Sequence, residues 1–299
     1  MVTSAPALTP ARVWWSAVRP ATLAASVSPV LGGTAIAVSE GGARPVAGLA
    51  AAAVGVAMQL GVNFANDYSD FRRGADTPRR IGPVRAASSG VVAPEHVRLA
   101  AIASFGLAGV IGLALSLATD WRLILIGAAC LLAGWLYTGG PRPYGYLGLG
   151  ELFVFAFFGL VATCGTVYVE ELHVSLLAIL AGCGFGFLAS AILVLNNLRD
   201  IETDAAAGKR TLATRIGRDN TRHLLAVLVV AAFAMPFVAV ATTTVSTWVT
   251  LAEVALPLAI GPLRVAYGST AGPALVGALK QMAATEMVFA LLLAAGVLL

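Results

Sequence analysis

The chain has little charge. Only 11% of its 299 residues are Asp, Glu, Lys or Arg, whereas 59% are hydrophobic, and the mean hydropathy is +0.87. A water-soluble domain carries charge on about a quarter of its residues. The composition therefore excludes a soluble globular fold and indicates an integral membrane protein.

Cysteine and histidine are also scarce. The three cysteines lie inside apolar runs without CxxC spacing, which excludes a disulfide framework and a thiolate metal site. The three histidines are scattered near the ends of apolar runs, so we expect neither a zinc centre nor a histidine-activated nucleophile. The net charge of +4 does not indicate nucleic acid as a partner, because the cations lie in short loops and form no nucleic-acid-binding motif.

Nine apolar runs are long enough to cross about 30 Å of hydrocarbon as helices. We therefore predict an all-α integral membrane protein with a bundle of about nine transmembrane helices, in one domain over residues 21–299 after an N-terminal segment, 1–20. Two arginines precede the first run, as in a signal peptide, but a retained helix is favoured because another span follows directly. The predicted spans are 21–38, 46–66, 98–117, 122–139, 151–169, 174–195, 223–241, 246–267 and 281–299.

Lysine and arginine lie almost entirely on one side of this topology. Seventeen of the 19 fall in the N-terminal segment and in every second loop, and only Arg44 and Arg122 fall in the other loops. The positive-inside rule then predicts a cytoplasmic N-terminus and an outside C-terminus. The predicted location is the cell membrane, with cytoplasmic loops at 63–90 and 196–218.

Six of the 15 acidic residues concentrate in two segments of these loops, 63–77 and 196–211. The first reads NFANDYSDFRRGADT and the second reads NNLRDIETDAAAGKRT, and each begins where an apolar helix reaches the membrane surface. At helical spacing three residues of each segment share one helix face. These residues are Asn63, Asp67 and Asp70 in the first segment, and Asn196, Asp200 and Asp204 in the second.

The two segments also resemble each other. When residue 63 is aligned with residue 197, four of 15 positions are identical, and Asn66 is aligned with the similar Asp200. A weak internal repeat of this kind often places a site at the interface between its copies. The identities are Asn63 with Asn197, Asp70 with Asp204, Gly74 with Gly208, and Thr77 with Thr211.

Carboxylates that share a helix face repel one another unless a cation lies between them. Hard oxygen ligands suit Mg²⁺, which binds through a few carboxylates together with substrate phosphates, and the neighbouring cations suit phosphate oxygens. We therefore predict a diphosphate held by metal between the two segments. Exclusion of charge from the bilayer explains where the acidic residues lie but not their repeated register.

Three longer strings resemble a known family. They are GADTPRRIGPVRAASSG (74–90), YTGGPRPYGYLGLGE (137–151) and NNLRDIETDAAAGKRTLA (196–213). With the span number and the positions of the acidic segments, they resemble the UbiA superfamily of intramembrane prenyltransferases. Within it they are most similar to the 1,4-dihydroxy-2-naphthoate polyprenyltransferases of menaquinone synthesis. Ser69 departs from the pattern, which more often has a bulky aromatic residue there.

The resemblance implies Mg²⁺-dependent transfer of a polyprenyl group from polyprenyl diphosphate to 1,4-dihydroxy-2-naphthoate, with loss of CO₂ to give demethylmenaquinol. It implies two bridging Mg²⁺ ions and catalytic roles for Asp67, Asp70, Asp200 and Asp204, with Asp76 as a further metal ligand. The implied substrate-binding residues are Asn63, Asn66, Arg72, Arg79, Arg85, Tyr137, Arg142, Tyr144, Asn196, Asn197, Lys209 and Arg210.

Other interpretations remain open. The same fold and chemistry on another acceptor, such as 4-hydroxybenzoate, homogentisate, haem or a glycerol phosphate, is one alternative. A cation-coupled transporter is another, but it would need polar groups deep in several helices, whereas the acidic residues gather at one membrane face. Tyr146 lies in the second string, where it either contacts the acceptor or the diphosphate or belongs to an interfacial aromatic belt, and Glu151 is expected to orient that loop. Glu253 and Glu286 fall inside spans and are expected to pair with polar neighbours.

Overall fold

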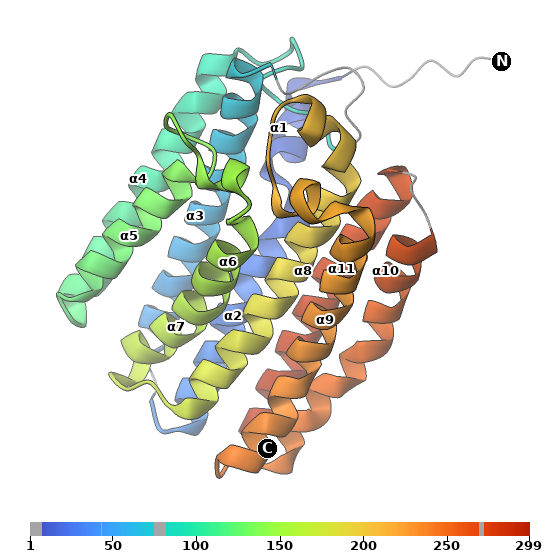
Figure 1. Cartoon of the computed structure of the whole chain (residues 1–299). Coiled ribbons are helices and arrows are strands. Elements are labelled where there is room, and N and C mark those ends of the chain that lie inside the picture. The colour runs from blue at the N-terminus through green and yellow to red at the C-terminus, as the bar shows by residue number, and fades with distance from the viewer. Residues whose placement is uncertain (1–7, 43, 75–81, 269–271) are drawn as a thin grey trace.

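A computed structural model describes residues 8–42, 44–74, 82–268 and 272–299, and every regular element among them is helical (Figure 1). The α-helices are α1 (Pro10–Val18), α2 (Pro20–Ser39), α3 (Pro45–Arg72), α4 (Pro94–Ala118), α5 (Leu123–Leu136), α6 (Gly150–Val154), α7 (Ala162–Glu171), α8 (Leu176–Ala206), α9 (Leu212–Thr242), α10 (Leu256–Gly268) and α11 (Gly272–Leu298). Shorter turns are η1 (Tyr144–Leu147), the π-helical η2 (Phe155–Val161) and η3 (Thr247–Ala255).

The nine predicted spans correspond to helices of the described chain. Eight helical segments are long and apolar enough to cross a bilayer, and the predicted span 122–139 corresponds to the shorter apolar helix α5. Helix α5 ends at Leu136 because the following sequence turns at Gly140 (φ +75°) and continues with Pro141. The prediction of a multi-pass helical membrane protein is confirmed.

The helices begin where the sequence supplies suitable residues. Helices α1 to α4 each start with proline, whose fixed φ suits the first helical position. Helix α1 was not predicted: Thr9 caps its start, Arg19 ends it in the left-handed region (φ +52°), and Trp14 packs edge-on against Phe64 of α3. The N-terminal segment is thus partly a docked helix.

Helix α8 lies at the centre of the bundle, against α2, α9, α11 and η2 (Figure 1). Its residue Phe185 packs edge-on against Phe289 of α11, which also meets Phe233 of α9. Helix α8 comes closest to η2 at Gly159, where an added Cβ would lie 2.4 Å from Gly182 O and from Gly186 Cα. Small residues permit such a close approach of two membrane helices, and this contact fixes η2 against α8.

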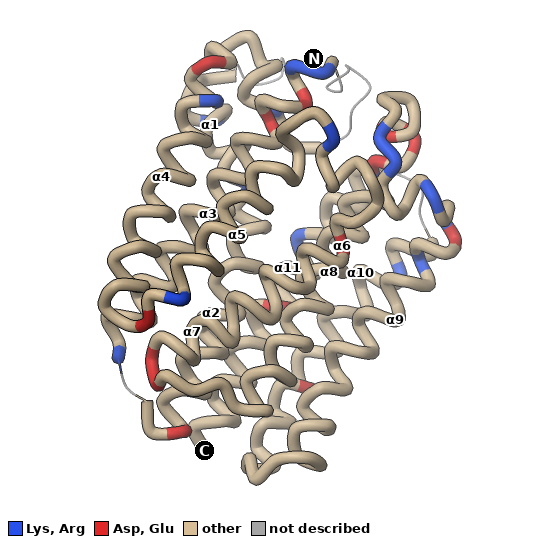
Figure 2. Tube along the Cα trace, turned by 60° about the vertical axis from the view of Figure 1, so that its left-hand side comes forward, with Lys and Arg blue, Asp and Glu red and all other residues tan. Residues whose placement is uncertain are grey.

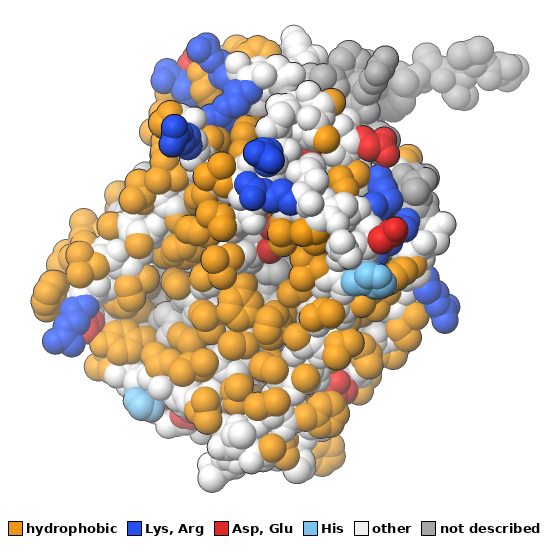
Figure 3. Space-filling model, viewed as in Figure 1, with side chains coloured by type: hydrophobic (Ala, Val, Ile, Leu, Met, Phe, Trp, Pro, Cys, Tyr) orange, Lys and Arg blue, Asp and Glu red, His pale blue; other side chains and the backbone are white. Residues whose placement is uncertain are grey.

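Charge is concentrated at the end of the bundle where α3 and α8 terminate, called the motif end below (Figure 2). Hydrophobic side chains cover the middle of the face seen in Figure 3, and most of its Lys and Arg lie toward the motif end. Both acidic segments start on helices, because α3 continues to Arg72 and α8 to Ala206, beyond the predicted spans. The Asn and Asp residues that repeat between the two segments therefore lie on the ends of α3 and α8.

Candidate active site

Asp67 holds the segment after α3 against the bundle. Its carboxylate is fully buried and accepts hydrogen bonds from the backbone N–H groups of Ala86 (2.8 Å) and Ala87 (3.1 Å). A carboxylate with several amide donors is well stabilised in its charged form. Asp67 thus fixes the chain that carries Arg85 beside the next aspartate on the same helix face.

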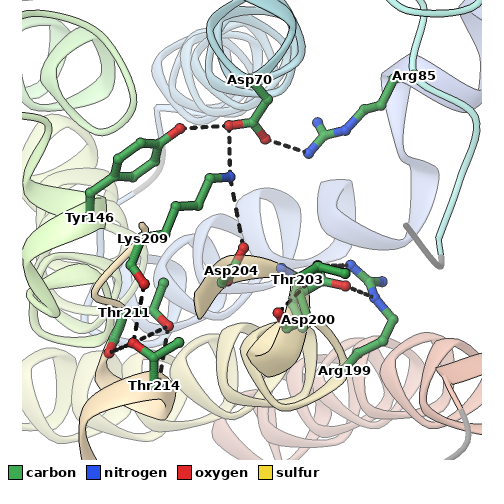
Figure 4. Close-up of polar contacts among 11 residues, drawn as sticks. Asp70, Arg85, Tyr146, Arg199, Asp200, Thr203, Asp204, Lys209, Thr211 and Thr214 are labelled. Carbon is green, nitrogen blue, oxygen red and sulfur yellow. Dashed lines mark hydrogen bonds and ion pairs between the residues drawn. The ribbon is translucent and has the colours of Figure 1, made fainter. Parts of the chain in front are cut away.

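Asp70, one turn further along α3, joins three separate segments of the chain (Figure 4). Its Oδ1 accepts hydrogen bonds from the Lys209 ammonium and from the Tyr146 hydroxyl, each at 2.7 Å. Its Oδ2 accepts one from Arg85 at 2.9 Å. The predicted residues Asp70, Arg85 and Lys209 are therefore brought together, in a nearly buried cluster with two cations on one carboxylate.

Lys209 also connects the two acidic segments. Its Nζ lies 3.8 Å from Oδ1 of Asp204 on α8, as well as 2.7 Å from Asp70 on α3. Asp200 pairs with the neighbouring Arg199, whose guanidinium also donates to Asn196 Oδ1 at 2.9 Å. The protein's own cations thus balance the carboxylates at the place where the sequence predicts a metal and a diphosphate.

The repeated glycines have a common structural role. Gly74 follows α3 with φ +67° and Gly208 follows α8 with φ +73°, and each N–H donates to the carbonyl oxygen three residues before it, at 3.1 Å. Glycine is favoured in this left-handed conformation at helix ends. At Gly208 the turn directs Lys209 back toward α3, and Thr211 caps the start of α9 directly afterwards.

Tyr146 and Arg73 close the motif end. The guanidinium of Arg73 donates to the carbonyl oxygens of Thr138 and Gly140, and it lies 5.1 Å from the centre of the Tyr146 ring. Lys209 lies 4.9 Å from the same ring. Burial first, and then the charge of Asp70, raise the pKa of the Tyr146 phenol, so it stays a neutral donor at physiological pH.

A deeper polar layer lies below this cluster. The Asn197 amide donates to Oε1 of Glu151 at 2.9 Å, and the ring of Tyr137 packs 5.5 Å from that of Tyr144. Glu151 was expected to orient the 137–151 loop, but its side chain is directed to α8. The predicted residues Tyr137, Tyr144 and Asn197 thus all contact α6, at Gly150, Phe153 and Glu151 respectively, and not the charged cluster around Asp70.

The remaining predicted residues are placed less centrally. Asn63 is buried, and its amide donates to Val18 O and Thr22 Oγ1 and accepts from Gln59, so it ties α3 to α2. Asn66 is half-buried. Three predicted arginines have exposed side chains at the motif end: Arg72, Arg142 and Arg210. Two predicted residues, Asp76 and Arg79, lie outside the described residues.

The aspartates suit Mg²⁺ in type, because they are hard carboxylate ligands on two facing helices. Within the described residues, however, no three Asp, Glu, His or Cys side chains are gathered closely enough to hold a metal ion. The ammonium of Lys209 lies between Asp70 and Asp204 and balances their charge. The carboxylates therefore suit Mg²⁺ in type, and the neighbouring Lys209 and Arg85 suit the phosphate oxygens of a diphosphate.

One expectation about buried acids is wrong. Glu286 of α11 is fully buried, and neither of its carboxyl oxygens has a hydrogen-bond partner in the part of the chain that the structure describes. Oε1 of Glu253 also lacks one there. Among the described residues, the predicted pairing with a polar neighbour is therefore absent at both oxygens of Glu286 and at Oε1 of Glu253.

The chain is similar to known proteins over most of its length. The model of the UbiA prenyltransferase family matches residues 26–276. A Mycobacterium tuberculosis protein named 1,4-dihydroxy-2-naphthoate octaprenyltransferase is 43% identical over 94% of this chain and 95% of its own length. A Bacillus subtilis protein of the same name is 31% identical over 96% and 93%.

Solved structures show the same fold at low sequence identity. A UbiA homolog from Aeropyrum pernix, at 15% identity, has a TM-score of 0.68 over 92% of this chain and 96% of that one. A UbiA homolog from Archaeoglobus fulgidus bound to DMAPP and Mg²⁺, also at 15% identity, has a TM-score of 0.64 over 95% and 99%. At this identity the likeness concerns the arrangement of helices alone.

Proposed function

Because the chain belongs to the UbiA prenyltransferase family, we propose that it transfers a polyprenyl group from polyprenyl diphosphate to 1,4-dihydroxy-2-naphthoate, with loss of CO₂. The product is the demethylmenaquinol of menaquinone biosynthesis. Relatives named for this substrate match over more than nine-tenths of both chains. The structural observation that carries the proposal is the Lys209 bridge between Asp70 and Asp204, which joins the acidic helix ends.

The polar residues of the motif end would bind the diphosphate head. Arg85 and Lys209 already converge on Asp70, and both suit phosphate oxygens once these replace the carboxylate as acceptors. The side chains that would hold Mg²⁺ are Asp67, Asp70, Asp200 and Asp204. When bound, the metal supplies charge neutralisation for the departing diphosphate. This role has a parallel in the Archaeoglobus homolog bound to DMAPP and Mg²⁺.

The polyprenyl tail would lie in an apolar groove between α2 and α11. This groove has a volume of about 310 Å³ and extends along both helices from the motif end. Its walls are almost entirely apolar, with Pro20 and Lys280 nearest the motif end. Burial of hydrocarbon there removes the tail from water while the head stays near the cations. The lining residues are Pro20, Ala21, Leu23, Ala24, Val27, Lys280, Ala283, Ala284 and Met287.

The reaction balances without an external base. The C–O bond to the diphosphate breaks, and its electron pair leaves with the diphosphate. A ring carbon of the acceptor forms the new C–C bond, and the carboxylate leaves as CO₂, so its bonding pair stays on the ring. No net proton is lost. The developing allylic cation must be shielded from water, and the loop that Arg73 and Tyr146 hold over the motif end provides cover.

The motif end is proposed to face the cytoplasm, in the cell membrane. The support is the distribution of Lys and Arg: among the described residues, Arg44 before α3 and Arg122 before α5 lie at the other end, and most of the remaining cations lie toward the motif end. The soluble acceptor would then reach the site from the cytoplasm, the released diphosphate would leave into it, and the lipid product would leave into the bilayer.

The function is tested with purified protein in lipid nanodiscs, Mg²⁺ and a radiolabelled polyprenyl diphosphate. 1,4-Dihydroxy-2-naphthoate and 4-hydroxybenzoate are offered in parallel, and lipid products are identified by mass. A decarboxylated prenyl-naphthalenediol that disappears with EDTA is the expected result. Product only with 4-hydroxybenzoate would retain the reaction type and overturn the acceptor, and no product with either would overturn the proposed function.

A further inference from the structure

Glu151 has an incomplete set of hydrogen bonds. It lies in the first turn of α6, and 9% of its surface is exposed. Oε1 accepts a hydrogen bond from Asn197 Nδ2 at 2.9 Å, whereas Oε2 is buried without a partner among the described residues. A buried carboxylate oxygen without a donor is costly and therefore requires an explanation. A bound molecule that donates a hydrogen bond would supply one.

The position of Glu151 places that donor beneath the diphosphate site. Asn197, Asp200 and Asp204 share one face of α8, and seven residues of helix separate Asn197 from Asp204 by about 10 Å along the axis. Glu151, bonded to Asn197, thus lies deeper in the bundle than the acidic rim.

The surrounding structure holds Glu151 in place. The Ser190 hydroxyl of α8 donates to the backbone carbonyl of Glu151 at 3.1 Å. The Tyr137 hydroxyl lies 3.8 Å from the point where a Cβ on Gly150 would be, so the Tyr137 ring packs directly against the start of α6. A carboxylate fixed at both its backbone and one oxygen is suited to orient a ligand through the other oxygen.

We propose that Oε2 of Glu151 accepts a hydrogen bond from a ring hydroxyl of the aromatic acceptor, and thereby orients the ring below the prenyl diphosphate. This inference rests on the proposed function and assigns one contact within it. A hydroxyl that donates to a carboxylate releases electron density into its ring, which favours attack on the allylic carbon. Because CO₂ leaves its electron pair behind, the hydroxyl proton is shared with Glu151 and not removed. Asn197 is a positioning residue that acts through Glu151.

The test combines a variant with acceptors that lack one hydroxyl. Wild type and Glu151→Gln are assayed with 1,4-dihydroxy-2-naphthoate, 1-hydroxy-2-naphthoate and 4-hydroxy-2-naphthoate. In wild type, loss of the contacted hydroxyl should lower kcat/KM at least about ten- to a hundredfold, as expected for a hydrogen bond to a charged group. Glu151→Gln should lower kcat/KM for the dihydroxy acceptor by a similar factor. The ratio of kcat/KM for the dihydroxy acceptor to kcat/KM for the acceptor without the contacted hydroxyl should be at least about tenfold smaller in Glu151→Gln than in wild type. KM for the prenyl diphosphate should not change.

Glu170→Gln is the matched control. Glu170 is also buried, with 2% of its surface exposed, and one oxygen accepts from Thr34 Oγ1 at 2.6 Å while the other has no partner in the described chain. Glu170 lies at the opposite end of the bundle, so Glu170→Gln should leave the discrimination between the acceptors unchanged.

The outcomes separate this inference from the proposed function. No product from wild type with 1,4-dihydroxy-2-naphthoate would overturn the function itself. Wild-type turnover with an equal loss on all three acceptors in Glu151→Gln would keep the function and overturn the hydroxyl contact. If Glu151→Gln does not fold, the wild-type series decides, because equal kcat/KM for the dihydroxy acceptor and both monohydroxy acceptors also overturns the contact.

Discussion

The ammonium of Lys209 lies 2.7 Å from Oδ1 of Asp70, a residue 139 positions earlier in the chain. This ion pair joins the end of α3 to the turn after α8 and is largely buried. The same ammonium lies 3.8 Å from Oδ1 of Asp204, so two carboxylates share it. In the proposed reaction the phosphate oxygens of the substrate would compete with these carboxylates for Lys209.

Lys209→Gln should lower kcat/KM for the prenyl diphosphate about 10²- to 10³-fold, because one preorganised cation for the departing diphosphate is lost. Steady-state kinetics in nanodiscs measure this effect. The control is Arg122→Gln at the opposite end, where the arginine side chain is exposed and its ion pair with Asp120 is loose at 4.0 Å. A fall of less than about threefold in Lys209→Gln would contradict a role in diphosphate binding.

Asp200→Asn and Asp67→Asn should each abolish turnover, since both remove a charge that would hold Mg²⁺. The two variants should differ in stability. Asp67 accepts two backbone hydrogen bonds within the bundle, whereas Asp200 pairs only with the neighbouring Arg199 among the contacts seen. Thermal unfolding followed by size-exclusion chromatography should show the larger loss for Asp67→Asn. Activity above about a tenth of wild type in both would exclude the metal-bridge account, because such stabilisation is worth ~10²–10³-fold.

The sequence predicted the spans and the two acidic faces because both are local patterns. Hydropathy and a period of 3.6 residues are encoded within 20 neighbouring residues. Contacts such as Tyr146 with Asp70, 76 positions apart, depend on how a loop folds over two helices, and no local pattern gives their partner. Glu286 shows a different limit: buried acids in membrane helices usually pair, but no partner for it lies in the described residues.

Tyr146→Phe should reduce kcat about three- to tenfold, because it removes the phenol donor to Asp70 but keeps the ring beside Lys209 and Arg73. The raised pKa of Tyr146 means that its hydroxyl stays protonated from pH 7 to about pH 10. Deprotonation at higher pH would remove the donor and place a second negative charge beside Asp70. Rate profiles of wild type and variant over this range should therefore be parallel. An alkaline decrease present only in wild type would show that the phenol ionises at its ordinary pKa or below.

Gly159→Ala should destabilise the protein by about 1–3 kcal/mol, since the new methyl group would overlap Gly182 O and Gly186 Cα at 2.4 Å. The strain should also move α6, and with it Glu151, away from α8, so KM for the aromatic acceptor should rise more than KM for the diphosphate. Gly165→Ala on the adjoining helix α7 is the control, because its Cβ would meet nothing within 4 Å. Thermal unfolding and the two KM values measure both effects. Equal stability of the two variants would show that the η2 and α8 backbones separate at little cost, and α6 would then not be the rigid support that positions Glu151.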